Sequence, residues 1–117
     1  MPYFLQRNGA SVVVTVTGES VVGSAHRGMK DRLLEVIAED ARHITIRLHG
    51  VEYLDSDALG MLVSIRKRAR EAGGSVTLEG LTTGVHTLLD VTKLASLFTL
   101  IDCEPSAWHR GALTEAT

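Results

Sequence analysis

The chain has one cysteine, Cys103, and so cannot close a disulfide within itself. It has two prolines and no run rich in glycine or serine, so nothing in the composition indicates a linker between domains. Its formal net charge of −2 gives no basic footprint for nucleic acid, and we expect no direct nucleic-acid partner. No apolar run is long enough for a bilayer span, and no signal-peptide pattern opens the chain, so we expect no membrane insertion and a cytoplasmic location.

The patterns that mark metal sites and catalytic sites are also missing. The histidines share no metal-ligand spacing, and with a single cysteine they predict no metal site. No glycine-rich loop continues into Lys and Ser or Thr, and no nucleophile elbow is present. Receiver-type phosphorylation of Asp55 needs an acidic pair at the end of an early strand, and the strand predicted at residues 12–17 ends without one. We therefore expect no enzymatic activity and no cofactor.

What the chain does contain is a regular alternation of strand and helix patterns. Its 117 residues, 44% of them hydrophobic, are enough for one domain with its own core. The patterns predict strands at residues 3–6, 12–17, 43–48, 75–78 and 98–101, and helices at 24–39, 56–72 and 83–90, with a weak helix at 107–110. This order predicts a single α/β domain over residues 1–117, with a core at 4–102 and a tail at 103–117. The sheet is expected to be mixed but mostly parallel, with four to five strands and flanking helices.

Apolar spacing also predicts which faces are buried. On the first helix and the strand that follows it, the predicted core residues are Met29, Leu33, Val36, Ile37, Ile44, Ile46 and Leu48. On the second helix they are Leu59, Leu62, Val63, Ile65 and Ala69. Basic residues crowd the last turns of that helix and Gly73-Gly74 follows, which predicts its end.

The strongest functional signal lies in residues 50–60. An apolar strand leads into a short acidic loop with Asp55, Ser56 and Asp57, and a helix begins at once. Ser56 therefore lies at or next to a helix N-terminus, where free backbone N–H groups and the helix dipole favour negative charge. Its hydroxyl can be a plain cap or a phosphate acceptor, and Asp55 can cap the helix or contact a partner. Asp57 fits pairing with the helix dipole.

The element Asp55-Ser56-x-x-Leu59-Gly60 stands within a longer ordered set of short motifs. Gly18-Glu19, the strand at residues 44–48 and the segment 51–56 come first. The segments 69–74 and 78–81 follow, and then Leu88-Leu89, Leu94 and Leu97-Phe98. In this order and spacing, residues 4–102 resemble a STAS domain of the bacterial anti-sigma factor antagonist type.

The resemblance implies transcription regulation by partner switching. It implies that Ser56 is phosphorylated by a serine-kinase anti-sigma factor, and that the unphosphorylated protein binds this kinase and so frees a sigma factor. It also implies a PP2C-type phosphatase that resets the switch. The docking face implied by the resemblance comprises the loop at residues 19–23, the loop before Ser56 and the start of the next helix, with the contact residues Glu19, Ser20, Val21, Asp55, Ser56, Asp57, Ala58 and Leu59.

Three positions depart from the family pattern. Asp57 stands where a second hydroxyl residue is common, Ala58 where glycine is common, and Lys93 where glycine is expected after Thr92. Ala58 is compatible with a helix, whereas Asp57 places negative charge at the site before any phosphate arrives. An alternative keeps the fold without the switch: a STAS scaffold or accessory subunit of a transport or signalling complex. The two hypotheses differ in whether Ser56 is phosphorylated and whether phosphorylation changes binding.

Overall fold

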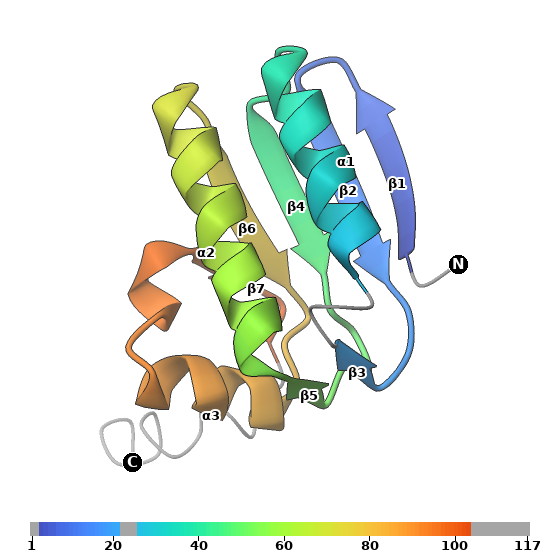
Figure 1. The fold of residues 1–117 in the computed structure, drawn as a ribbon. Helices are drawn as coiled ribbons and strands as arrows, with labels where there is room; N and C mark the ends of the chain where they lie inside the picture. Colours follow the sequence, from blue (N-terminus) through green and yellow to red (C-terminus); the bar gives the residue numbers. More distant parts are fainter. Residues whose placement is uncertain (1–2, 22–25, 104–117) are drawn as a thin grey trace.

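The computed structural model describes residues 3–21 and 26–103. Its centre is a five-stranded sheet in the order β1-β2-β4-β6-β7 (Figure 1). The strands are β1 (Tyr3–Asn8), β2 (Ser11–Val16), β4 (His43–Arg47), β6 (Ser75–Glu79) and β7 (Thr99–Ile101). β1 pairs antiparallel with β2, and each of the other pairs is parallel. The predicted mixed, mostly parallel sheet is confirmed.

Two long helices lie side by side over one face of this sheet: α1 (Arg27–Ala38) and α2 (Ser56–Glu71) (Figure 1). Each follows a strand and leads to the next parallel strand, so both begin at the same edge, where β2 and β4 end. α3 (Thr83–Val91) lies near this edge and is followed by a short 3₁₀-helix, η1 (Ala95–Leu97). The first residues of the helix predicted at 24–39, and the whole helix predicted at 107–110, lie outside the described residues.

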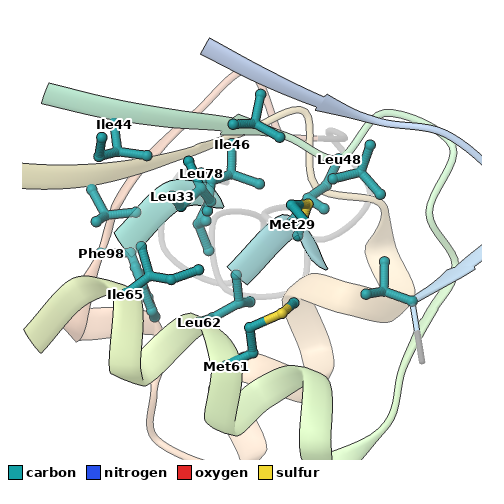
Figure 2. Packing of buried hydrophobic residues seen from close by; sticks show 14 of the residues in the cluster. Met29, Leu33, Ile44, Ile46, Leu48, Met61, Leu62, Ile65, Leu78 and Phe98 are labelled. Carbon is teal, nitrogen blue, oxygen red and sulfur yellow. The ribbon is translucent and has the colours of Figure 1, made fainter. Parts of the chain in front are cut away.

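The core fills the space between the sheet and the two helices. Figure 2 shows Leu62 and Ile65 of α2 pointing toward the sheet residues Ile46 and Leu78, with Leu33 of α1 between the layers. All the residues predicted to be buried on α1 and β4 are buried. On α2 the prediction was partly wrong: Leu59 and Val63 are only half-buried, and the buried residues are Ala58, Met61, Leu62, Ile65 and Ala69. This set follows the helical period, and Leu59 and Val63 lie one residue to its side.

Two further strands, which were not predicted, join the loops at the edge where α1 and α2 begin. β3 (Ser20–Val21) and β5 (Tyr53–Leu54) pair in parallel as a separate small sheet. The carbonyl of Glu19 accepts hydrogen bonds from the N–H groups of Glu52 at 2.6 Å and Tyr53 at 3.1 Å. The loop after β2 is thereby fastened to the loop before α2. A strand of two residues has no periodicity, so the sequence patterns gave no sign of it.

The three α-helices in the described residues end in the same way. The residue after each C-cap has a left-handed backbone: Asp40 with φ 81°, Gly73 with φ 85° and Lys93 with φ 62°. The next N–H then bonds back to a carbonyl in the last turn, in the pairs Ala41 to Val36, Gly74 to Ala69 and Leu94 to Leu89. The helix end predicted at Gly73 is confirmed. Lys93 keeps the left-handed conformation that a glycine adopts without strain.

Candidate functional site

Asp55 is the N-cap of α2. Its backbone is extended, and its carboxylate oxygen Oδ1 accepts a hydrogen bond from the N–H of Ala58 at 2.7 Å. Ser56 is the first residue of the helix and is exposed, and its hydroxyl makes no hydrogen bond to any described residue. Of the two residues that could cap the helix, Asp55 is the one that does so. The hydroxyl of Ser56 does not cap the helix and stays accessible.

The residues implied in docking divide into an exposed set and a supporting set. Glu19, Ser20, Ser56 and Asp57 are exposed, and Asp55 and Leu59 are half-buried. Val21 and Ala58 are buried, so their side chains belong to the core beneath the exposed docking residues. The pairing of β3 with β5 brings Glu19 and Ser20 beside the loop that leads to Ser56. Residues 22 and 23 of the predicted docking loop lie outside the described residues.

A hollow of about 550 Å³ lies beside Ser56, between the first turns of α1 and α2. Ser56, Asp57, Gly60, Met61 and Ser64 of α2 form one wall, and Arg27, Lys30 and Asp31 of α1 form the other. We call this the α1–α2 hollow. The sequence patterns assign no functional role to Arg27 or Lys30. The signal that points to them is topological: two helices in successive parallel crossovers begin at one edge of the sheet.

The described residues contain no group of three or more His, Cys, Asp or Glu side chains that could hold a metal ion. None of the helices in residues 3–21 and 26–103 is long and apolar enough to cross a membrane. The chemistry of the site therefore lies in an exposed hydroxyl, a few carboxylates and the cations of α1.

Comparison with known proteins identifies the family. A family model described as "Mlab, STAS domain" matches residues 3–101. The chain belongs to the STAS-domain family. The anti-sigma-B factor antagonist of Bacillus subtilis (strain 168) is 32% identical over 93 residues, which cover 80% of this chain and 84% of that protein. The resemblance predicted from the ordered motifs is confirmed.

Solved STAS structures have the same fold. The anti-sigma factor antagonist SpoIIAA in its unphosphorylated form has a TM-score of 0.76 and 15% identity, covering 93% of this chain and 95% of that one. The Bacillus protein SpoIIAA in its phosphorylated form has a TM-score of 0.71 and 14% identity, covering 98% and 99%. At these identities the likeness shows the STAS fold alone, and it extends over almost the whole of each chain.

Proposed function

We propose that this STAS protein is an anti-sigma factor antagonist switched by phosphorylation of Ser56. In its unphosphorylated form it binds a serine-kinase anti-sigma factor and so releases a sigma factor. Phosphorylation of Ser56 by that kinase ends the binding, and a PP2C-type phosphatase restores it. The observation that carries the proposal is the exposed hydroxyl of Ser56, next to a helix cap made by a different residue, Asp55.

The local structure supports Ser56 as a phosphate acceptor. A kinase needs a hydroxyl that it can reach, and Ser56 is exposed and not used as the cap. A phosphate at the first turn of α2 gains from the free N–H groups and the positive end of the helix dipole. The capping bond, which the N–H of Ala58 donates to the Asp55 carboxylate, does not involve the Ser56 hydroxyl, so phosphorylation leaves the helix start intact.

The face around Ser56 supports an effect of phosphorylation on binding. Its exposed residues Glu19, Glu52 and Asp57 are acidic, and a phosphate adds a charge of about −1.5 to −2 at pH 7. A partner complementary to the unmodified face then meets excess negative charge, and unmatched charge at an interface is costly. Because β3 and β5 fasten the two loops together, the face is held in place before a partner arrives.

The relatives support the same role. The Bacillus subtilis relative is named an anti-sigma-B factor antagonist, and SpoIIAA has been solved in both an unphosphorylated and a phosphorylated form. The order of events proposed for this chain, with a kinase partner and a phosphatase, accounts for both forms. The protein acts by binding, and no catalytic step is assigned to it.

The proposal is tested by capture from a lysate of the native organism, with phosphoserine genetically encoded at position 56. The baits are wild type, Ser56→Ala, the phosphoserine-56 protein and a control with phosphoserine at position 11. Ser11 is exposed and begins β2, at the opposite edge of the sheet. We expect an ATP-binding serine kinase on wild type, Ser56→Ala and the control. On the phosphoserine-56 bait we expect at least tenfold less, about 1.4 kcal/mol.

Equal capture of the same partner by all four baits contradicts the switch. If that partner is a subunit of a transport or signalling complex, the scaffold hypothesis replaces the proposal. Phosphopeptide mapping of the native protein adds an independent check, because the proposal requires phosphate on Ser56 in a fraction of the molecules.

A further inference from the structure

The first turn of α1 carries two cations that face the proposed phosphorylation site. Arg27 and Lys30 line the α1–α2 hollow from one side, and Ser56 lines it from the other. Neither cation forms an ion pair with any carboxylate in the described part of the chain. One turn further along α1, Arg32 pairs with Glu35 and so faces a partner on its own helix. The two cations that line the hollow with Ser56 are thus available to an anion placed in it.

The position of these cations is unfavourable for α1 itself. The helix begins at Arg27, Lys30 lies three residues on in the same turn, and no acidic residue stands in that turn. Positive charge near a helix N-terminus opposes the dipole, so α1 loses stability through this choice of residues. A phosphoryl group in the hollow offsets this loss of stability, because each cation then lies near an opposite charge.

We propose that Arg27 and Lys30 receive the phosphoryl group of phospho-Ser56 as charge-assisted hydrogen-bond donors across the α1–α2 hollow. This inference rests on the proposed phosphorylation of Ser56 and adds an intramolecular binding site for the modification. The hollow is wide enough for a phosphoryl group, and guanidinium and ammonium groups are its usual protein partners. Both are positioning residues, because they hold the modification and take no part in its transfer.

Opposing charges face the same space. Asp57 and the capping Asp55 lie on the side of Ser56, and Asp31 lines the hollow from α1. Before phosphorylation, Arg27 and Lys30 are balanced against Asp31 and Asp57 around the hollow. A phosphate of charge about −2 makes the two cations its only favourable charged partners among the lining residues. The phosphorylated state then depends on them, whereas the unphosphorylated state does not.

The regulatory consequence concerns the lifetime of the phosphorylated state. A phosphoryl group paired with Arg27 and Lys30 is partly withdrawn from a phosphatase, and its second proton dissociates at lower pH. The pairing also joins the start of α1 to the start of α2. In the unphosphorylated protein this connection is absent, and the two first turns are separated by the hollow.

The test uses phosphoserine encoded at position 56, so no kinase is required. Three proteins are compared in phosphorylated and unphosphorylated form: wild type, Arg27→Gln with Lys30→Gln, and a control with Lys67→Gln and Arg70→Gln. Lys67 and Arg70 are exposed on α2 and without an ion pair in the described residues, so the control removes the same charge farther from Ser56. The phosphate is titrated by phosphorus NMR, and thermal unfolding is measured for all six samples.

We expect the second pKa of the phosphate to be about 0.5 to 1 unit higher in the Arg27→Gln, Lys30→Gln protein than in wild type. The control is expected to agree with wild type. The unfolding midpoints give opposite signs: the Arg27 and Lys30 changes raise the midpoint of the unphosphorylated protein and lower that of the phosphorylated one. A merely structural role predicts the same sign in both forms.

Equal phosphate pKa values in wild type and the Arg27, Lys30 variant overturn the inference. An equal rise of the phosphate pKa in the Lys67, Arg70 control also overturns it. That result would come from the change in net charge and would show no local contact. Neither result bears on partner switching, which fails separately if phosphoserine at position 56 leaves capture of the kinase unchanged. Removal of the phosphate by a broad-specificity phosphatase gives a second readout, expected to be several times faster in the Arg27, Lys30 variant than in the control.

Discussion

The carboxylate of Asp55 accepts a hydrogen bond from the N–H of Ala58 at 2.7 Å and thereby begins α2. This contact bears on the neighbouring residue, Ser56. Because Asp55 caps the helix through the N–H of Ala58, the hydroxyl of Ser56 is not needed as the cap, and Ser56 is exposed. In the acidic loop, Asp55 thus has the structural role of the cap, and the adjacent Ser56 is accessible for modification.

Removing the cap weakens the start of α2. We expect Asp55→Ala to lower the free energy of unfolding by about 0.5–2 kcal/mol, measured by urea denaturation. Asp55→Asn keeps an accepting oxygen and is expected to lose much less. Asp57→Ala is the matched control in the same turn, since it removes a carboxylate that favours the dipole without capping, at about 0.3–1 kcal/mol. A loss for Asp55→Asn as large as that for Asp55→Ala contradicts the assignment of Asp55 as the cap.

Gly60 lies in the interior of α2, and no steric contact within residues 3–21 and 26–103 requires a glycine there. It is exposed, and a Cβ built on it meets nothing within 4 Å. Gly60→Ala is therefore expected to stabilise the fold by about 0.5–1 kcal/mol through helix propensity, measured as a rise in the urea midpoint. Because Gly60 also lines the α1–α2 hollow beside Ser56, weaker capture of the kinase by this more stable variant locates the partner there. Loss of stability contradicts the prediction.

Gly74 is the opposite case. A Cβ there lies 1.9 Å from the carbonyl oxygen of Arg42, which already accepts the N–H of Ser75 at 2.8 Å. The backbone at Gly74 or at Arg42 must move to admit it, at the junction where β6 begins beside β4. We expect Gly74→Ala to cost about 2–3 kcal/mol or more, measured by the same denaturation experiment. A loss below that of an ordinary surface substitution, about 0.5 kcal/mol, shows that the close approach is not maintained in solution.

Lys93 occupies a left-handed position at the end of α3, where the family pattern has glycine. Its φ of 62° strains any residue with a side chain, and the side chain is exposed. Lys93→Gly is expected to raise the free energy of unfolding by about 0.5–1 kcal/mol, the relief of strain less the greater freedom of glycine in the unfolded chain. Lys93→Ala serves as the control and is expected to bring no gain. If alanine stabilises as much as glycine, the effect does not come from the backbone.

Ser56→Ala separates stability from switching. The Ser56 hydroxyl has no hydrogen bond to the described residues, so we expect a change in unfolding free energy within about 0.5 kcal/mol. In cells the variant is expected to act as an antagonist that cannot be turned off, measured as constant transcription from the sigma-dependent promoters. Normal regulation in the Ser56→Ala strain contradicts the assignment of this residue as the switch.

Sequence reasoning was most successful where a pattern repeats. The β-branched run of β2, the alternation of β4 and the helical spacing of α1 each depend on a local period, so these elements were predicted closely. Sequence reasoning was less successful where the surrounding layers determine which side of a helix is buried. Leu59 was assigned to the core from apolar spacing, but the buried stripe runs through Ala58 and Met61. Which side of an apolar stripe is buried depends on the two layers that cover it, and spacing along the helix alone does not show that.

By itself the sequence determined the STAS fold, the order of its elements and the serine that follows an aspartate at the start of α2. These properties arise from periodicity, helix-end chemistry and short motifs, all local along the chain. Only the tertiary structure decided that Asp55 is the cap, that β3 fastens the loop after β2 to the loop before Ser56, and that Arg27 and Lys30 line one hollow with Ser56. The physical reason is that parallel crossovers bring segments some thirty residues apart to one edge of the sheet.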